Sequence, residues 1–588
     1  MKSEAVKPSA TISKLKFSSG NEIHLKENEK VIIVGPNNSG KSQSLRDIYQ
    51  ICKRGPSISN IAVADIEISK TGDRDHLLKF LENNAELNER AYIYQDWNIH
   101  SIHIQHWNLE YLPGDLTDGF VRKITATNRL NICEQQASIK PNEQKTKPQH
   151  ILYDNDAKMS IISGLFKDAF GKDLMFDFRG GSVLPIHVGN IPDRNVYVDR
   201  ASTAYSEEVR KNSLLDKQGD GMKSYAGILF EALVSQRDIT LIDEPEAFLH
   251  PPQMRRLGKV LASEVERQLF IATHSSDILR GFLEGARGNI RILRIHRDGD
   301  KNRVFEASPD ALKDLWEKPI LRYSNALDGI FHEQTIICED NSDCRLINAI
   351  ADHVAEKPNE IWQDTAYVPA GGKHQIHYVA RVLRQIGVPV KAIFDIDFLS
   401  EKSLVKETVE AFGGNWQELQ TNWERVDNVV KKEFSSKSPK EIRDEIYSIL
   451  KDSNEKELPK RDIINAMKKG NPWNTLKRLG QNALPRGQAQ TQFNQLKTKL
   501  EEIGIFIVHV GEIENFCRDI GGHGPKYVTK LLSDIKPDDD RLEELRNFVK
   551  AVHYGNHAIL PSNSYSTIGA NSPINESASS LCPEKSPA

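Results

Sequence analysis

VIIVGPNNSGKS, residues 31–42, decides the fold of the first half of the chain. Its first four residues are apolar, as in a buried strand, and the next eight fit the phosphate-loop pattern G-x-x-x-x-G-K-[ST], with a helix expected from Gln43. In such a loop the glycines let backbone N–H groups point at phosphate oxygens, the lysine reaches the β- and γ-phosphates, and the hydroxyl binds Mg²⁺. We therefore predict ATP and Mg²⁺ binding by Gly35, Pro36, Asn37, Asn38, Ser39, Gly40, Lys41 and Ser42.

Two acidic residues follow a later apolar run, ITLID at 239–243, in which Asp243 is the last residue and Glu244 comes next. A helical stretch then leads to a second run, LFIAT at 269–273, and this alternation predicts parallel strands. We expect Asp243 to bind Mg²⁺ and Glu244 to polarise the attacking water. His274 would lie at the carboxyl edge of the sheet, where it can contact the γ-phosphate.

These motifs resemble the ABC-type ATPases of the structural-maintenance-of-chromosomes and recombination-repair kind, in which DEPE..LHP and THS are characteristic. The resemblance covers roughly the first 300 residues. It implies that a signature loop from a second subunit completes the nucleotide site, so the chain would work as a homodimer or higher homo-oligomer. That loop would lie in DKQGDGMKSYAGILFEAL, 216–233, which lacks the common LSGG spelling. Its expected nucleotide contacts are Gly219, Asp220, Gly221 and Met222. For the Mg²⁺-sensing glutamine of the family, Gln95 is a guess.

A second α/β alternation begins with TIICED at 335–340 and reaches KAIFDID at 391–397. Acidic residues end these apolar runs or follow them closely. Because strand side chains repeat every second residue, the two aspartates of the later run are expected to face the same side. Carboxylates at strand ends form a hard oxygen site for Mg²⁺ or Mn²⁺, where paired ions activate water against a phosphodiester. The expected metal ligands are Glu339, Asp343, Asp395 and Asp397.

This arrangement is similar to a TOPRIM domain, whose pattern is a glutamate on the first strand and D-x-D on a later one. The chain departs from the pattern at Asp340, where the family usually has glycine, and PAGGKHQI at 369–376 resembles a glycine turn of this domain. In related nucleases a late glutamate and a lysine complete the metal and phosphate contacts. Of Glu512 and Glu514, the second is the expected counterpart, together with Lys526. The implied catalytic groups of this site are Glu339, Asp395, Asp397 and Lys526.

The patterns predict an α/β protein with two domains. Its expected parts are an ABC-type ATPase domain at 1–305 with a lobe inserted at about 71–202, a linker at 306–332, a TOPRIM domain at 333–560 with a helical insertion at about 400–500, and a disordered tail at 561–588. Residues 431–500 contain 16 Lys and Arg against 8 Asp and Glu, a local charge of +8. On charge alone, this excess fits a nucleic-acid contact and a solvated helical face about equally.

An ABC-type ATPase followed by a TOPRIM domain resembles the OLD (overcoming lysogenization defect) nucleases, including effectors of phage-defence systems such as Gabija, PARIS and some retrons. The resemblance implies an ATP-regulated, metal-dependent DNA endonuclease that assembles through its ATPase domains. A reverse transcriptase with its DNA, or a helicase, would then be a possible defence partner.

Three other functions remain open from the sequence. The chain could be an ATP-dependent clamp or repair scaffold whose TOPRIM domain binds nucleic acid without cutting it. Topoisomerase chemistry would need a nucleophilic tyrosine beside the acids, and none has a recognisable context. A structural ATPase with a degenerate second domain is the last alternative.

The composition of this chain of 588 residues limits the kinds of partner and the cellular compartment that we expect. With 78 Lys and Arg against 82 Asp and Glu, the net charge is −4, so any nucleic-acid surface has to be local. The six cysteines are scattered and form no C-x-x-C pair, which favours a reducing compartment. The chain contains no apolar run long enough to span a bilayer, and it begins with no signal-peptide pattern. We therefore expect a cytoplasmic protein without a membrane partner.

Overall fold

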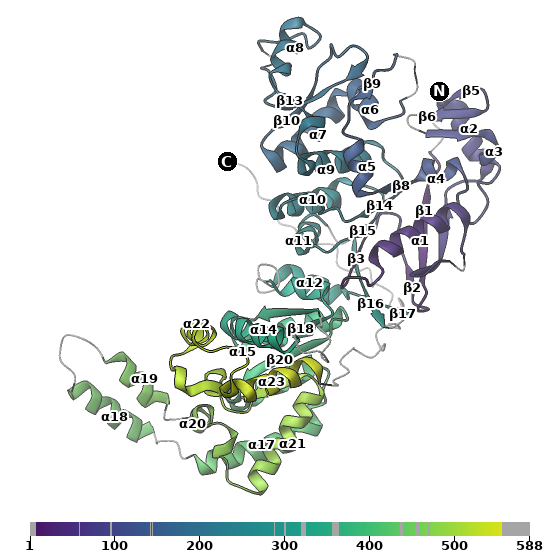
Figure 1. The fold of residues 1–588 in the computed structure, drawn as a ribbon. Coiled ribbons are helices and arrows are strands. Elements are labelled where there is room, and N and C mark those ends of the chain that lie inside the picture. Colours follow the sequence, from purple (N-terminus) through teal and green to yellow (C-terminus); the bar gives the residue numbers. More distant parts are fainter. Residues whose placement is uncertain are drawn as a thin grey trace, which may run out of the picture.

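The computed structural model describes residues 7–555, except 58, 95–96, 141–142, 144, 194, 287–288, 299–300, 319–324, 356–363, 435–438, 453–458 and 469–470. The expected disordered tail at 561–588 and Gln95 lie outside the described residues. Figure 1 shows two α/β parts joined near α12 (Pro309–Glu317), with the N-terminal part above and the C-terminal part below. In the described part of the chain, no helix has the length and apolar character needed to cross a membrane.

A six-stranded sheet forms the centre of the N-terminal part. Its order is β17-β16-β3-β15-β14-β8, and every neighbouring pair is parallel except β16 with β17. The strands are β3 (Lys30–Val34), β8 (Val121–Ile124), β14 (Ile239–Asp243), β15 (Gln268–Ala272), β16 (Ile290–Asp298) and β17 (Lys301–Glu306). The uninterrupted apolar runs of β3 and β15 are fully buried, as expected of a sheet covered on both faces.

Helices and a smaller sheet cover this central sheet. The antiparallel sheet β2-β1-β4 is tied to it by Gln268, whose side chain accepts from Ile12 N–H at 2.8 Å and donates to Ile12 O at 2.7 Å. The covering elements are β1 (Ala10–Phe17), β2 (Glu22–His24), β4 (Val63–Lys70), α1 (Lys41–Arg54), α10 (Pro251–Glu264) and α11 (Ser276–Gly285).

The stretch expected as one inserted lobe, about 71–202, does not stand apart from the central sheet. Its strand β8 pairs in parallel with β14, so the chain returns to the sheet within that stretch. The other α-helices and strands described before β14 are α2 (Arg74–Asn84), β5 (Glu86–Asn88), β6 (Ala91–Tyr94), β7 (Trp97–His100), α3 (Ser101–Ile104), α4 (Asp115–Phe120), α5 (Ala126–Asn131), β9 (Gln136–Ala137), α6 (Pro148–Asp154), α7 (Asp156–Phe170), β10 (Asp173–Phe176), β11 (Val183–Leu184), β12 (Ile186–Gly189), α8 (Thr203–Arg210), β13 (Ser213–Leu214) and α9 (Asp220–Leu229).

The C-terminal part contains a four-stranded parallel sheet in the order β19-β18-β20-β21. Because all four strands are parallel, their carboxyl ends share one edge, where acidic side chains can meet. The strands and their covering helices are β18 (Gln334–Cys338), α14 (Asn341–Ala355), β19 (Thr365–Pro369), α15 (Lys373–Gln385), β20 (Val390–Asp395), β21 (Ile505–Val508), α22 (Gly524–Asp534) and α23 (Glu543–Tyr554).

In the described part of the segment between β20 and β21, six α-helices interrupt this sheet. They are α16 (Lys402–Ala411), α17 (Trp416–Glu433), α18 (Pro439–Asp452), α19 (Lys460–Lys468), α20 (Pro472–Leu479) and α21 (Gln488–Glu502). Two buried tryptophans fasten this helical insertion, since Trp423 donates to Leu399 O at 2.9 Å and Trp473 donates to Asp427 Oδ1 at 3.0 Å. Helices α18 and α19 extend away from the rest of the domain (Figure 1).

One buried arginine connects the two parts. Arg294, on β16, is fully buried, and its guanidinium donates to Ile330 O at 3.1 Å, Gly387 O at 2.7 Å and His332 O at 2.8 Å. All three acceptors are backbone carbonyls of the C-terminal part or of the segment that leads into it. Burial lowers the pKa of Arg294 to about 10, so the guanidinium stays charged near neutral pH.

We expect Arg294→Met to lower the free energy of unfolding of the C-terminal domain by about 3 kcal/mol or more. Three buried carbonyls would lose a charged donor, and each hydrogen bond to a charged group contributes about 1.5–3 kcal/mol. Urea denaturation, with hydrogen exchange near His332 and Gly387, measures the effect. The matched control is Arg297→Met on the same strand, which changes an exposed side chain and should cost about 0.5 kcal/mol or less. Equal losses in the two variants would contradict the assigned role of Arg294.

Candidate functional site

The phosphate loop lies between β3 and α1. Lys41, only 4 % exposed, donates from Nζ to Gly35 O at 2.8 Å and to Pro36 O at 2.6 Å. Burial lowers the pKa of Lys41 to about 8. Gly35 has φ +141°, and a Cβ atom there would lie 2.2 Å from the Ile295 carbonyl oxygen, so only glycine fits against β16. The loop is therefore curled around its lysine and backed by the strand that carries Arg294.

The predicted acids after β14 lie beside this loop. Ser42 Oγ donates to Asp243 Oδ1 at 2.8 Å, which joins the two expected Mg²⁺ ligands. Glu244 has φ +47°, a left-handed conformation, and half of its side chain is exposed. His274 Nε2 lies 4.0 Å from Glu244 Oε1, and burial, followed by the charge of Lys41, lowers the pKa of His274. The structure thus brings together the five residues that sequence motifs placed around the γ-phosphate.

Two further residues belong to this site that we did not predict from the sequence. Glu246 accepts from the His274 N–H at 2.6 Å and from the Thr273 hydroxyl at 2.9 Å, so it fixes the loop that presents His274. The buried Arg129 donates to Glu244 O at 2.9 Å and thereby supports the left-handed backbone there. The second glutamate of DEPE was a visible signal for Glu246, but no local pattern marks Arg129.

The expected signature loop, Gly219 to Met222, lies at the start of α9. Gly221 packs against the segment that follows Glu244, because a Cβ atom there would lie 2.7 Å from Phe248 O. Within the described residues, no hydrogen bond or ion pair joins this loop to the phosphate loop of the same chain.

A second group of acids lies at the carboxyl edge of the β18–β20 sheet. Glu339 directly follows β18, Asp343 lies in the first turn of α14, and Asp395 is the last residue of β20. We expected strand alternation to orient Asp395 and Asp397 alike. In the structure β20 ends at Asp395, and Asp397 belongs to the 3-10 turn Ile396–Ser400. The turn, rather than a strand, brings the two carboxylates together.

The pKa values of these acids reflect burial and mutual repulsion. Burial, then the charge of Asp395, raises the pKa of Glu339 to about 7. Burial, then the charge of Asp340, raises the pKa of Asp343 to about 8. Burial also raises the pKa of Asp395 to about 6. Burial opposes the ionisation of Asp397 as well, but nearby lysines outweigh it and lower the pKa of Asp397.

Two lysines that the sequence did not assign to this site contact the aspartates. Lys477, from α20, lies 2.8 Å from Asp395 Oδ2 and 3.1 Å from Asp397 Oδ1. Lys373, at the start of α15, lies 3.0 Å from Asp397 Oδ2 and 3.2 Å from Glu401 Oε1. The glycine turn before Lys373 was a visible signal, whereas Lys477 lies in a helix far along the sequence.

The lysine that the sequence did favour, Lys526, is exposed on α22 and makes no hydrogen bond or ion pair within the described part of the chain.

Asp340, the departure from the TOPRIM pattern, has a local role. Its Oδ1 accepts from the Ser342 and Asp343 N–H groups at 2.7 and 3.1 Å, so it caps the first turn of α14.

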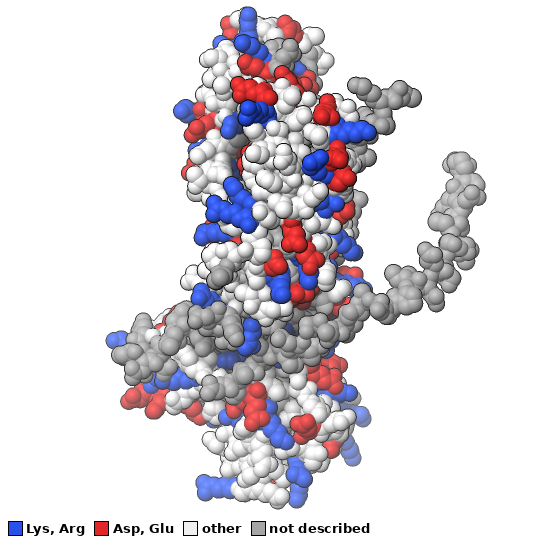
Figure 2. Space-filling view, turned by 90° about the vertical axis from the view of Figure 1, so that its right-hand side faces the viewer, with Lys and Arg blue, Asp and Glu red and all other residues white. Residues whose placement is uncertain are grey.

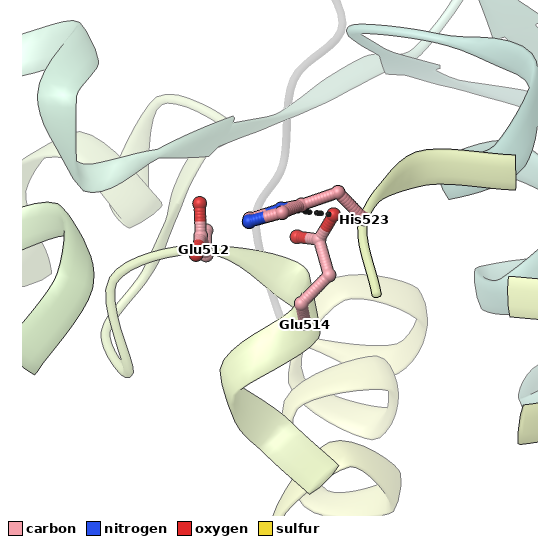
Figure 3. A group of neighbouring side chains, drawn as sticks. All are labelled: Glu512, Glu514 and His523. Atoms are coloured by element: carbon pink, nitrogen blue, oxygen red, sulfur yellow. Dashed lines mark hydrogen bonds and ion pairs between the residues drawn. The ribbon is translucent and has the colours of Figure 1, made fainter. Parts of the chain in front are cut away.

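A third set of ligand atoms lies after β21. The ligand atoms of Glu512, Glu514 and His523 all lie within 4.8 Å of one another (Figure 3). Glu514 Oε1 lies 3.3 Å from His523 Nδ1 and accepts from the Gly524 N–H at 2.8 Å. The charge of Glu514 contributes to the raised pKa of Asp395, which places this set beside the aspartates. Glu514 thus lies near the expected metal ligands, and His523 is a neighbour that the sequence did not indicate.

The donor atoms fit a divalent metal ion. Glu339 Oε1 is buried and has no hydrogen-bond partner within the described residues. The neighbouring donors are carboxylate oxygens, the ligand type that Mg²⁺ and Mn²⁺ prefer. Burial and mutual repulsion raise the pKa values of Glu339 and Asp343. A bound cation would stabilise the charged forms of these carboxylates.

Two family models match the chain, one in each part. Residues 65–280 match "AAA domain, putative AbiEii toxin, Type IV TA system", and residues 330–397 match "Overcoming lysogenization defect protein-like, TOPRIM domain". The order of the two matches is that of an OLD-family ATPase–TOPRIM fusion. An AAA-type ATPase domain therefore precedes an OLD-like TOPRIM domain, and the sequence predicted this order of an ATPase and a TOPRIM domain. A search of curated proteins finds no match.

Solved structures similar to this chain include SMC heads and an ABC ATPase. An SMC head bound to the C-terminal winged-helix domain of ScpA is 12 % identical, covers 51 % of this chain and 98 % of its own, and has a TM-score of 0.32. The SMC head domain from Thermotoga maritima is 14 % identical, covers 52 % and 100 %, and has a TM-score of 0.28. A dimeric ATP-binding cassette with ADP and phosphate is 14 % identical, covers 48 % and 93 %, and has a TM-score of 0.22.

The raised pKa values predict that the acidic edge destabilises the metal-free protein as pH rises. A carboxyl whose pKa is raised in the folded state stabilises the fold while protonated, and that stability is lost as pH rises through the folded pKa. We expect the loss to begin near pH 4, where the carboxyls of the unfolded chain ionise, and to end near pH 8, once Asp395, Glu339 and Asp343 have all ionised in the folded chain. Melting temperatures in a chelating buffer across this window measure it.

The variant Glu339→Gln/Asp343→Asn should lose less stability than the wild type across the same window. The matched control is Asp352→Asn, an exposed aspartate on α14, the helix that also carries Asp343, which should leave the pH profile unchanged. Parallel profiles for the wild type and the double variant would contradict the assigned electrostatics.

Proposed function

The chain has the domain arrangement of an OLD-family ATPase–TOPRIM fusion, and we propose that it is an ATP-regulated, divalent-metal-dependent DNA endonuclease. The observation that carries the proposal is the set of carboxylates at the carboxyl edge of the TOPRIM sheet. Glu339 directly follows β18, Asp395 ends the neighbouring parallel strand β20, and Asp397 lies in the turn after β20. Their charges shift one another's pKa values. Carboxylates this close together favour a bound cation.

In this proposal, Glu339, Asp343, Asp395, Asp397 and Glu514 hold Mg²⁺ or Mn²⁺. A bound ion of this kind supplies an activated water and stabilises the leaving oxygen of a phosphodiester. The chain's own residues orient these ligands, because Asp340 fixes the start of α14 and the Gly524 N–H fixes Glu514. Lys526 is exposed on the nearby α22, where it could contact a DNA phosphate.

The ATPase half is proposed to bind ATP·Mg²⁺ through the phosphate loop, Ser42 and Asp243. Glu244 would hold the attacking water as general base, with His274 beside it at the γ-phosphate. The signature loop from Gly219 to Met222 makes no bond to the phosphate loop of its own chain. We therefore propose that a second copy contributes this loop and that the working unit is at least a homodimer.

Regulation by ATP has a physical route between the domains. Gly35 of the phosphate loop lies against the Ile295 carbonyl, and the neighbouring residue, Arg294, binds three carbonyls at the start of the TOPRIM part and after α15. A change in the phosphate loop would thus act on a strand that is bonded directly to the TOPRIM domain. This contact supports control of DNA access by the nucleotide.

We propose that DNA binds through local groups of cations. On the face shown in Figure 2, Lys and Arg are interspersed with Asp and Glu. The helical insertion contributes the local excess of basic residues, 16 against 8 over 431–500. The proposed role as an anti-phage effector, with a reverse transcriptase and its DNA or a helicase as partner, rests on the family resemblance.

The nuclease assignment predicts metal-dependent cleavage that is lost in Asp395→Ala/Asp397→Ala. Plasmid and single-stranded DNA are incubated with Mg²⁺ or Mn²⁺, with and without ATP, and cleavage is followed on gels. Removing two metal ligands should slow the reaction by about a thousandfold or more, because a bound metal contributes several kcal/mol to the transition state. The matched control is Asp538→Ala/Asp540→Ala, an exposed D-x-D pair of the same domain, which should cut normally.

Cleavage that persists in Asp395→Ala/Asp397→Ala would contradict the assigned site. DNA binding by the wild type without cleavage under any of these conditions would favour an ATP-dependent clamp or scaffold instead.

The ATPase assignment predicts different losses at Lys41 and Glu244. Lys41→Ala should lose ATP binding, because it removes the cation beneath the phosphates. Glu244→Gln should bind ATP but hydrolyse it about 10²–10⁴-fold more slowly, since it removes the general base. Equilibrium binding of labelled ATP and phosphate release measure the two effects. Glu264→Gln, an exposed glutamate on α10, is the matched control. Normal hydrolysis by Glu244→Gln would rule out this base.

A further inference from the structure

The ammonium of Lys477 lies between two carboxylates of the acidic edge. Its ammonium contacts Asp395 at 2.8 Å and Asp397 at 3.1 Å, and its side chain is 27 % exposed. The two aspartates raise the pKa of Lys477 enough to outweigh the opposing effect of burial. The lysine is therefore charged, and it neutralises part of the repulsion between the carboxylates.

The backbone holds Lys477 in this position. Its carbonyl accepts from Asn515 Nδ2 at 3.0 Å, and a Cβ atom on Gly511 would lie 1.9 Å from the same oxygen. Gln481, just after α20, donates its backbone N–H to His509 O at 2.8 Å. The end of α20 is thus docked on the loop after β21, the loop that also carries Glu512 and Glu514.

The other end of α20 is anchored inside the helical insertion. Trp473, 1 % exposed, donates to Asp427 on α17, and Lys431 pairs with the same aspartate at 2.7 Å. Lys477 is therefore not a loose surface side chain that folds onto the acids. It is presented by a short helix that is fixed to the insertion at one end and to the acidic edge at the other.

We propose that Lys477 is a positioning residue that acts as an internal counter-cation for Asp395 and Asp397 and competes with a divalent metal ion for them. The inference rests on the proposed function, because it concerns the same carboxylates. A metal ion that binds Asp395 through Oδ2 and Asp397 through Oδ1 has to displace the ammonium, because Lys477 occupies these two oxygens. Metal loading is then coupled to the position of α20, and through it to the helical insertion.

Mn²⁺ binding to the full chain tests this directly, without a measurement of cleavage. The wild type, Lys477→Gln, Lys477→Arg and Lys497→Gln are titrated with Mn²⁺ at one pH and one ionic strength, and free Mn²⁺ is followed by electron paramagnetic resonance. Lys497 is the matched control, because it pairs with Glu501 at 3.5 Å on α21 of the same insertion.

We expect Lys477→Gln to bind Mn²⁺ about tenfold or more tightly than the wild type. A neighbouring opposite charge changes the proton affinity of a carboxylate by about 1–3 pKa units, and a competing metal ion experiences the same charge. Lys477→Arg, which keeps the charge, should bind like the wild type, and so should Lys497→Gln. Unchanged or weaker binding by Lys477→Gln would overturn the inference.

Two further variants distinguish a failure of the inference about Lys477 from a failure of the proposed metal site. Asn515→Ala keeps the lysine but removes a bond to its carbonyl, so it should tighten Mn²⁺ binding by a smaller factor; it also tests the inference if Lys477→Gln does not fold. Asp395→Asn should weaken Mn²⁺ binding. If it does not, the metal site of the proposed function is wrong, and the inference about Lys477 fails with it. If it does, and Lys477→Gln binds like the wild type, only the inference fails.

Discussion

The burial of the Arg294 guanidinium is the constraint on which the arrangement of the two domains depends. A buried cation without a carboxylate partner is costly unless its N–H groups are satisfied, and here three backbone carbonyls satisfy them. Separation of the domains would expose these carbonyls and return the charge to water. Because β16 also backs the phosphate loop at Gly35, the same strand supports the nucleotide site and carries the junction.

The two sites use lysines in opposite electrostatic settings. Lys41 is held by the backbone carbonyls of Gly35 and Pro36, and desolvation dominates, so its pKa falls. Lys477 is held by two carboxylates, and their charges dominate, so its pKa rises. An anion such as a triphosphate offsets the effect of burial on the pKa of Lys41, whereas a second cation has to compete with Lys477. The same residue type therefore favours a nucleotide at one site and opposes a metal ion at the other.

Local patterns predicted the parts of the fold and of the site that lie at strand ends. The phosphate loop, Asp243, Glu244 and the order of the two domains could be inferred because each motif lies next to the strand that positions it. Arg294 could not, because RILRIHRD mixes basic and apolar residues as many half-exposed strands do, and its acceptors are distant carbonyls. Lys477 could not either, since its contact with Asp395 depends on how α20 packs. Sequence reasoning favoured Lys526, which is close in sequence to Glu514 but exposed in the structure.

The topology of the TOPRIM sheet explains why an insertion can reach the acids. β20 and β21 are parallel neighbours, so the connection between them starts at the carboxyl edge and has to return to the opposite edge. This connection contains α16 to α21, and it leaves β20 directly after Asp395. The docking of α20 on the loop after β21 brings the connection back to the edge where it began. A helix inserted at this point is therefore well placed to act on the carboxylates, because the strand that precedes it ends in one of them.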